Sequence, residues 1–467
     1  MATYLQQNPG FYRRVWKLML PIVLQNLITF SLGLIDTFMV SQLGNEEMAA
    51  VSTANAPAFL LISMVFGVQS GLGVLVSQYW GKRDLKSISR ALGVACFLGG
   101  GMVLLMAVVF ALFPVQIMDL LSNRHDLSLL GAPYLRIIGF AYVFNMISSI
   151  YSSAQRSVEN GAFGMKLFGF STLLNTGLNY LLIFGKFGCP ALGVAGAALA
   201  TLLSRMAECV ICIFCALRSK NIPLDLAALL HPGRDMARRF VKYASPVIVN
   251  EAVWGLGTSS ITVILGYTAN SVDMLAANAV IGNLSRLFLV VCLGLGAATG
   301  VLIGKAIGEG QPHAQVMALG YALQRFALQV GAVIAVVSVA LIPLLFIPVV
   351  FPLFKLYGAS ASIATAMALL NFGTIPIQAY GISAITGTLR CGGDVLWSTI
   401  LDITPQWCIS LPMLALFALV LDAGIWPIAL AMQMEHFIKM PLSMLRIRSG
   451  KWIHDVTRPV SEGGSPT

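Results

Sequence analysis

Long uninterrupted apolar runs are the feature that most constrains this chain. An α-helix rises about 1.5 Å per residue and the hydrocarbon core of a bilayer is about 30 Å thick, so about 20 apolar residues make one crossing. The 467-residue sequence contains twelve such runs, and only 10% of its residues are charged. That is too few polar side chains to cover a water-soluble globule of this size. The sequence therefore predicts an all-α integral membrane protein with twelve transmembrane helices.

The predicted spans form two groups of six, separated by a polar linker. The first group lies near 15–40, 53–79, 91–113, 132–154, 165–184 and 191–217, and the second near 240–267, 275–303, 316–341, 358–386, 396–419 and 423–445. None of these runs alternates polar and apolar residues as transmembrane β-strands do. The predicted organisation is an N-terminal lobe (1–217), a cytoplasmic linker (218–239), a C-terminal lobe (240–446) and a cytoplasmic tail (447–467).

The basic residues predict how the chain is oriented in the membrane. If the N-terminus is cytoplasmic, 22 of the 29 Lys and Arg residues fall inside, as the positive-inside rule requires. Only Arg124, Arg136, Lys186 and Lys355 fall outside, and the remaining three, Arg205, Arg286 and Arg325, lie within spans. The formal net charge of +10 is scattered between apolar runs, so no nucleic-acid partner is expected. Without long targeting segments, the pattern fits a multi-pass protein of a bacterial inner cell membrane, with both termini cytoplasmic.

The two halves of the sequence resemble each other in three places. LPIVLQN (20–26) matches SPVIVNE (245–251), GLGVLVSQYWGK (71–82) matches ATGVLIGKAIGE (298–309), and the region around Arg156 matches that around Arg390. The matches keep their order and their offset grows slowly, which indicates duplication of a six-helix unit in parallel orientation. Two like halves suit a transporter, because rocking one half against the other opens a central cavity to each side in turn.

Five stretches carry a resemblance that covers nearly the whole chain. They are LPIVLQNLITFSLGLIDTFMVSQLG, QSGLGVLVSQYWGKRD, NYLLIFGKFGCPALGVAGAALAT, ANAVIGNLSRLFLVVCLGLGAATGVLIGKAIGEG and GTLRCGGD. In these the chain resembles the multidrug and toxin extrusion (MATE) family of cation-coupled exporters. The resemblance implies two six-helix bundles in a V around a central cavity. It also implies exchange of small organic, often cationic, substrates for Na⁺ or H⁺, with no other cofactor, by a protein that we expect to be a monomer.

Asp36 is the leading candidate for the residue that couples ion movement to transport. It lies in the last third of the first span, with no basic residue one turn away. An ionised carboxylate in hydrocarbon costs roughly 2.5–3.5 kcal/mol on insertion scales, so it needs a partner, a proton or a water-filled cavity. The resemblance places a coupling carboxylate at this position. The alternative is a purely structural hydrogen bond between helices.

Three neutral polar residues are candidates to complete the Asp36 site. Asn175 and Asn179 are four residues apart and share one face of the fifth span, and Thr201 lies in the sixth. Their oxygens could surround a small cation. The family often has an acid at the position of Asn179. The amide here removes one possible negative charge, which weakens a two-carboxylate Na⁺ site and leaves the choice between Na⁺ and H⁺ open. The alternative is polar contact between membrane helices, worth about 0.6 kcal/mol.

Glu251 is the candidate in the second half. It lies one or two turns inside the seventh span, where the family also carries a functional acid, so a cation or substrate site is implied. The alternative is a structural ion pair with Arg286 on the eighth span. In the tenth span, where some relatives add another acid, this chain has Gln378, Ala379 and Tyr380.

The sequence also permits functions other than ion-coupled transport. A flippase or exporter of a lipid-linked saccharide is the main alternative, because related exporters share this helical plan. The sequence contains no HExxH or GxSxG motif, so no enzymatic activity is expected. Cys209, Cys212 and Cys215 recur every three residues, but no further ligand converges on them and no metal site is predicted.

Overall fold

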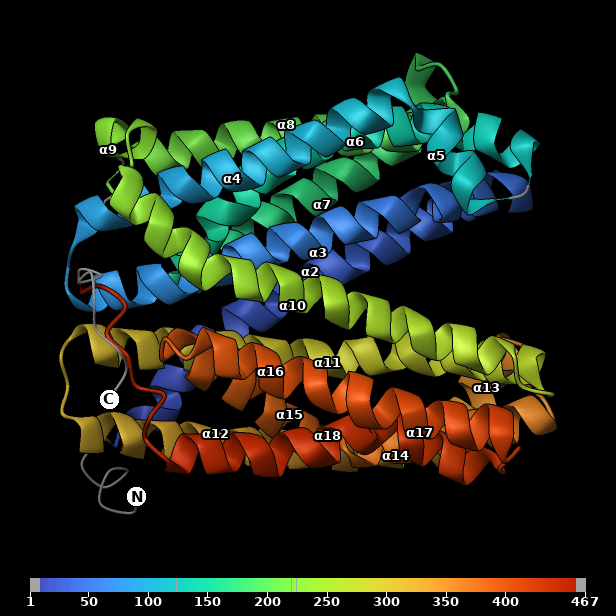
Figure 1. Cartoon of the computed structure of the whole chain (residues 1–467). Helices are drawn as coiled ribbons and strands as arrows, with labels where there is room; N and C mark the ends of the chain where they lie inside the picture. The colour runs from blue at the N-terminus through green and yellow to red at the C-terminus, as the bar shows by residue number, and fades with distance from the viewer. Residues whose placement is uncertain (1–8, 123, 220, 224, 459–467) are drawn as a thin grey trace.

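The chain folds into two helical bundles that lie one above the other (Figure 1). The computed structural model describes residues 9–122, 124–219, 221–223 and 225–458, apart from the side chain of Leu60. Residues 1–8 and 459–467, which the predicted N-terminal lobe and tail include, lie outside the described residues. The prediction of an all-α membrane protein is confirmed.

The first bundle is built from six long helices and short connections. They are α2 (Phe11–Ser41), α3 (Asn45–Gly81), α4 (Leu85–Leu112), α6 (His125–Ser157), α7 (Gly161–Phe184) and α8 (Gly193–Leu217), with α5 (Pro114–Leu121) and η1 (Lys186–Gly188) between them. The linker contains one short helix, α9 (Leu226–Leu230).

The second bundle has the same plan but is more irregular, because several of its helices continue through π-helical turns. It consists of α10 (Arg234–Gly266), α11 (Ser271–Gly308), α12 (His313–Leu341) with η2 (Ile342–Val350) and α13 (Phe351–Leu353), α14 (Ala359–Gly373), α15 (Ile375–Ile382) with η3 (Ser383–Leu389), α16 (Val395–Pro405) with η4 (Gln406–Ser410), α17 (Leu411–Ala415) and η5 (Leu416–Val420), and α18 (Ile425–Arg448).

Ten of the described helices are long and apolar enough to span a membrane. The predicted span near 358–386 is broken, because α14 and α15 meet at a bend of 47° and make an eleventh crossing only as a pair. Pro376 begins α15 there and removes a helical hydrogen bond. Helix α18 is less apolar because it carries Glu435, His436 and Lys439. With α18, each bundle contains six long helical segments.

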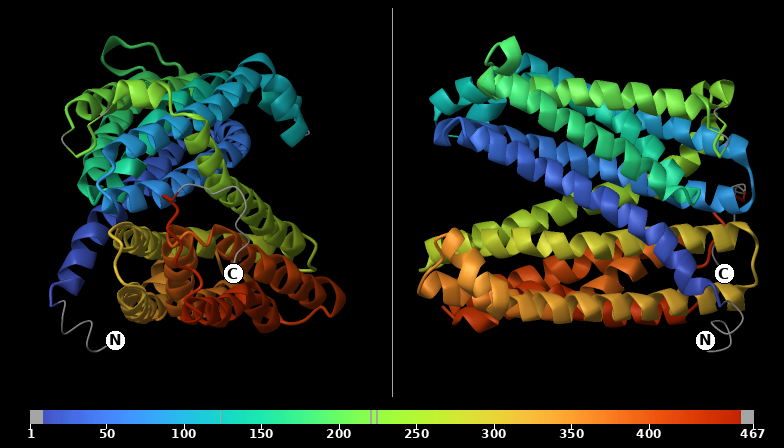
Figure 2. Two further views of the ribbon diagram at one scale, coloured as in Figure 1. Left: turned by 60° about the vertical axis from the view of Figure 1, so that its left-hand side comes forward. Right: turned by 180° about the vertical axis from the view of Figure 1, so that it is seen from behind.

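The first helix of each half crosses from one bundle to the other (Figure 2). The beginning of α2 packs in a core with α11 and α12, through Phe11, Val15, Leu18 and Met19. The beginning of α10 packs in a core with α3 and α4, through Met236, Phe240 and Ala244. Pro21 and Pro246, which the internal repeat pairs, lie inside these two helices near the crossing. Each half is therefore anchored in the other.

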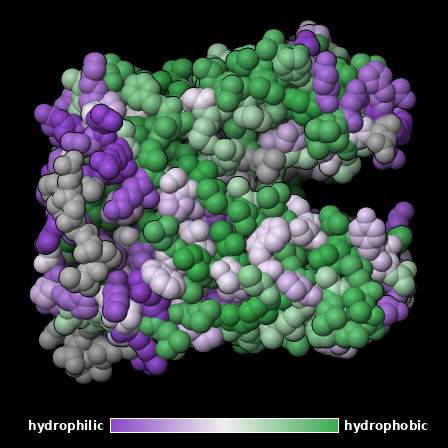
Figure 3. Space-filling view, viewed as in Figure 1, coloured by the Kyte–Doolittle hydropathy of each residue, from purple (hydrophilic) through white to green (hydrophobic). Residues whose placement is uncertain are grey.

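The bundles touch at the end of the molecule that carries both termini, here called the terminal end, and separate at the opposite end. There a cleft opens between them (Figure 3). At the terminal end α11 approaches α3 so closely that a side chain on Gly308 would collide with the carbonyl oxygen of Gln78. Lys305 also forms an ion pair with Glu159 across the bundles, at 2.6 Å. The terminal end is thus closed.

The residues after α18 reinforce this closure. The side chain of Gln78 accepts a hydrogen bond from the backbone N–H of Val456 (2.9 Å) and donates to the carbonyl of His454 (3.1 Å). Lys82 forms an ion pair with Asp455 at 3.0 Å. Burial acts to raise the pKa of Asp455, but hydrogen bonds from Thr457 and Lys82 outweigh it and hold that pKa below its usual range. The tail therefore joins the second bundle to the first.

We predict that Gly308→Val opens the terminal end, because the added side chain cannot fit against the backbone of α3. Spin labels at the exposed positions Lys86 and Gln315, in a background without native cysteines, should report a longer distance than in the unaltered protein. Gly282→Val is the matched control, since nothing lies within 4 Å of an added side chain at that position of α11. Equal distances in all three proteins would contradict the prediction.

Candidate functional site

The first bundle encloses a cavity of about 390 Å³ between α2, α3, α6, α7 and α8. One face of α2 lines it, because residues three and four apart share a helix face. This face includes Gly33, Asp36, Thr37 and Val40. The wall is mixed, with apolar side chains beside amides, hydroxyls and three charged groups. Such a cavity can hold a small organic molecule.

Asp36 is partly buried at the wall of this cavity. One of its carboxylate oxygens accepts a hydrogen bond from the Nδ2 of Asn179, at 2.6 Å. No Lys, Arg or His nitrogen of the described residues lies within 4.0 Å of the carboxylate. An amide stabilises the carboxylate without neutralising it, so the negative charge remains available to a cation or a proton.

A chain of hydrogen bonds leads from Asp36 into the bundle. Asn179 also contacts the Oδ1 of Asn175 (3.0 Å), and Asn175 donates to the hydroxyls of Thr201 (3.2 Å) and Ser204 (3.4 Å). Both asparagines are completely buried, and the Oδ1 of Asn179 has no protein partner within the described part of the chain. The four residues predicted for the first-half site therefore lie together. Ser204 was missed, although it follows Thr201 by one helical turn.

Arg205 lines the same cavity but is already paired. It lies one turn from the buried Glu208 on α8, and the two side chains form an ion pair. Glu208 is fully buried, so the pair is held inside the bundle. The pair adds no net charge to the site.

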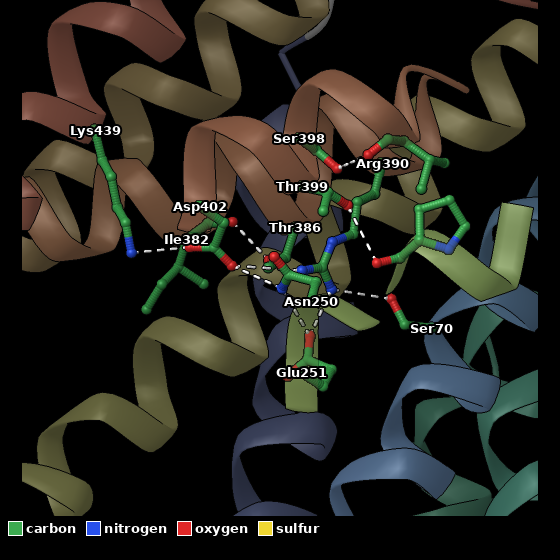
Figure 4. A network of polar contacts seen from close by, with 12 residues as sticks. Ser70, Asn250, Glu251, Ile382, Thr386, Arg390, Ser398, Thr399, Asp402 and Lys439 are labelled. Carbon is green, nitrogen blue, oxygen red and sulfur yellow. Dashed lines mark hydrogen bonds and ion pairs between the residues drawn. The ribbon is translucent and has the colours of Figure 1, made fainter. Parts of the chain in front are cut away.

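In the second bundle, Glu251 belongs to a buried network of charges (Figure 4). Its carboxylate accepts a hydrogen bond from Arg390 at 3.0 Å, and Arg390 also lies 3.6 Å from Asp402. Asp402 in turn pairs with Lys439 at 2.9 Å and accepts a hydrogen bond from Asn250 at 2.9 Å. The network joins α10, α16 and α18 near the bundle contact, where Arg390 reaches toward α3.

The alternative that paired Glu251 with Arg286 is wrong. Arg286 is exposed on α11 and forms no ion pair with the described residues. The true partner, Arg390, lies 139 residues from Glu251 in the sequence, so local spacing could not reveal it. Sequence reasoning also missed Asp402, although an acid inside an apolar run was a signal for it.

Lys439 does more than pair with its helical neighbour. It contacts Glu435 one turn away, at 3.1 Å, but its ammonium also reaches Asp402. The described residues contain no cluster of three or more His, Cys, Asp or Glu side chains that could hold a metal ion. All eight cysteines are free thiols.

Comparison with known proteins connects this architecture to one family. The sequence pattern of the MatE family matches residues 21–181. The chain is 25% identical over 426 residues to a protein named as a probable multidrug resistance protein, YoeA of Bacillus subtilis, with 88% of each chain covered. It is 22% identical over 463 residues to a probable multidrug resistance protein NorM of Thermotoga maritima, which covers 96% of this chain and 94% of that protein.

The fold agrees with solved transporter structures. A crystal structure of a mutant of the Vibrio cholerae MATE transporter VcmN superposes with a TM-score of 0.82 at 17% identity, covering 97% of this chain and 99% of that one. The agreement extends over both bundles and the crossing helices. The sequence matches and the shared two-bundle fold together make this chain similar to the MATE family of multidrug efflux transporters.

Proposed function

We propose that this protein exports small organic compounds by exchanging them for Na⁺ or H⁺, and that Asp36 is the residue at which the ion binds. The observation that carries the proposal is a carboxylate in a membrane-spanning helix, at the wall of a cavity, with an amide beside it and no base of the described residues in contact with it. Leaving such a charge without a counter-ion is costly in a membrane. A bound proton or sodium ion removes that cost.

The polar chain behind Asp36 supports ion binding at this position. Asn175, Asn179 and Thr201 offer neutral oxygens within one hydrogen-bonded cluster, and the Oδ1 of Asn179 is free to accept. A proton needs only the carboxylate. A sodium ion needs several oxygen ligands, of which this cluster could supply a part. The proposal therefore includes both Na⁺ and H⁺ as coupling ions, and transport measurements distinguish between them.

The crossing of α2 suggests how ion binding changes the conformation. Asp36 lies in the part of α2 that packs with α7, whereas Phe11 to Val23 pack in the core of the second bundle. Neutralising Asp36 would change the packing of α2 on one side of Pro21 while the other side stays anchored. We infer that this shifts the population between states open to opposite sides of the membrane.

The proposal extends to the second bundle and to the placement of the protein. Glu251 would contribute a second cation or substrate site, since its carboxylate binds Arg390, the side chain that contacts Ser70 of the first bundle. The protein would act as a monomer in a bacterial inner membrane. The terminal end would face the cytoplasm, and the cleft would face outward.

The first prediction about transport concerns Asp36, the proposed ion-binding carboxylate. Purified protein in liposomes should move fluorescent organic compounds, ethidium or dansylglycine, when a Na⁺ or pH gradient is imposed separately. Asp36→Asn should reduce this movement to the rate of protein-free liposomes, because the amide cannot bind and release a cation. Glu46→Gln, an exposed carboxylate at the start of α3, is the matched control. Full gradient-driven movement by Asp36→Asn would refute the assignment.

The second prediction concerns the choice of ion. Asn179→Asp would place a second carboxylate where an amide now lies 2.6 Å from Asp36. Two adjacent negative charges favour a cation between them, so the sodium concentration needed for half-maximal transport should fall. Asn145→Asp, elsewhere on the cavity wall, is the control for an added charge. An unchanged sodium response in Asn179→Asp would show that Asn179 is not part of the ion site.

The third prediction separates transport from stability in the second bundle. Glu251→Gln should slow gradient-driven movement with little change in unfolding temperature, because Arg390 keeps Asp402. Asp402→Asn should instead lower stability, by about 3 kcal/mol, since Lys439 and Arg390 both lose a buried partner. Transport by Glu251→Gln at the unaltered rate would leave Glu251 a purely structural role.

A further inference from the structure

The two halves present an arginine at the same place in the fold. The turns that follow these arginines have the same hydrogen bonds, 234 positions apart: Asn160 N–H to the Gln155 carbonyl at 2.9 Å, and Asp394 N–H to the Leu389 carbonyl at 3.0 Å. Arg156 and Arg390 each precede such a turn by the same number of residues. The internal repeat and the backbone thus agree that these two arginines are equivalent.

In the second bundle the arginine is neutralised. Arg390 is only 1% exposed, and two carboxylates surround its guanidinium, Glu251 at 3.0 Å and Asp402 at 3.6 Å. The guanidinium also donates a hydrogen bond to the hydroxyl of Ser70 on α3, at 3.3 Å. A buried guanidinium needs such counter-ions, since an unpaired charge in a low-dielectric interior is costly.

In the first bundle the equivalent arginine has no counter-ion. Arg156 is only partly buried and lines the 390 Å³ cavity. Its hydrogen bond goes to a neutral group, the Oε1 of Gln69, at 3.3 Å. Across the described residues, no carboxylate oxygen lies within 4.0 Å of Arg156. Its positive charge is therefore available to a molecule bound in the cavity.

The difference between the halves lies in two substitutions. The repeat offset of 225 makes Asn26 the counterpart of Glu251, and the offset of 234 makes Phe168 the counterpart of Asp402. Both Asn26 and Phe168 line the cavity with Arg156. An amide and a phenyl ring thus stand where the second bundle has carboxylates. The other arginine of this wall, Arg205, keeps its own partner in Glu208.

We propose that Arg156 binds the anionic group of the transported substrate, which makes amphipathic organic carboxylates a substrate class of this protein. A planar guanidinium binds a carboxylate through two parallel hydrogen bonds, and no acid among the described residues pairs with Arg156. The apolar body of the substrate would pack on Val65, Met146 and Phe168, which line the same cavity. This inference rests on the proposed function and specifies its substrate.

Two fluorescent probes that share one ring system test the inference. Dansylglycine carries a carboxylate and dansylcadaverine carries an ammonium group. Their binding to purified protein in lipid nanodiscs is measured by fluorescence polarisation without any ion gradient. The unaltered protein should prefer dansylglycine, and Arg156→Gln should weaken that binding by at least about tenfold while leaving dansylcadaverine unaffected. Arg156→Lys should keep part of the affinity, because it retains the charge but loses the planar fork.

Two further variants keep the result interpretable. Arg325→Gln, an exposed arginine on α12 outside the cavity, should bind dansylglycine like the unaltered protein. Asn26→Glu keeps Arg156 but supplies the counter-ion that the second bundle has, so it should lose dansylglycine binding as Arg156→Gln does. It serves as the test even if Arg156→Gln fails to fold.

The outcomes separate this inference from the proposed function. Equal dansylglycine binding by the unaltered protein, Arg156→Gln and Asn26→Glu would overturn the inference, as would a preference of the unaltered protein for dansylcadaverine. Gradient-driven movement of the probes in liposomes is measured in parallel. Selective binding without gradient-driven movement would leave the anion site standing and refute the exchange mechanism instead.

Discussion

The crossing of α2 and α10 is the constraint on which the rest of the structure depends. Each helix begins in the core of one bundle and ends beside the other, and each carries a proline between its two parts. The bundles therefore cannot move apart as independent bodies. Any change in their angle must bend or shift α2 and α10, and these are the helices that carry Asp36 and Glu251. Asp36 and Glu251 therefore lie on the two helices that must deform when the angle between the bundles changes.

The two halves share a backbone but differ in their chemistry. The turns after α6 and η3 are bonded alike, and so are those after α3 and α11. In the second half, Glu251 and Asp402 pair with Arg390, and Asp402 also pairs with Lys439. The first half places an acid, Asp36, and an arginine, Arg156, at one cavity wall, and neither forms an ion pair with the described residues. Duplication supplied the scaffold, and a few side-chain changes divided the roles of its two copies.

The sequence predicted what depends on local pattern. Long apolar runs located the helices, and helical spacing placed Asn175 and Asn179 on one face. The four first-half residues meet as expected because they lie on neighbouring helices of one bundle. Local pattern cannot predict ion pairs between residues that are far apart in the sequence. Arg390 was not recognised as the partner of Glu251, and Asp402 was missed, because 139 and 151 positions separate them from Glu251. The bend at Pro376 also escaped a reading based on hydropathy alone.

The tail that follows α18 has a consequence for how the protein is made. Its Val456 bonds to Gln78, a residue 378 positions earlier in the chain. Gln78 has therefore left the ribosome and entered the membrane long before its partner is synthesised. The first bundle must assemble with this amide unsatisfied, and the closed arrangement can be completed only after Val456 has been synthesised. Until then, the insertion machinery handles two bundles that are connected but not yet locked together.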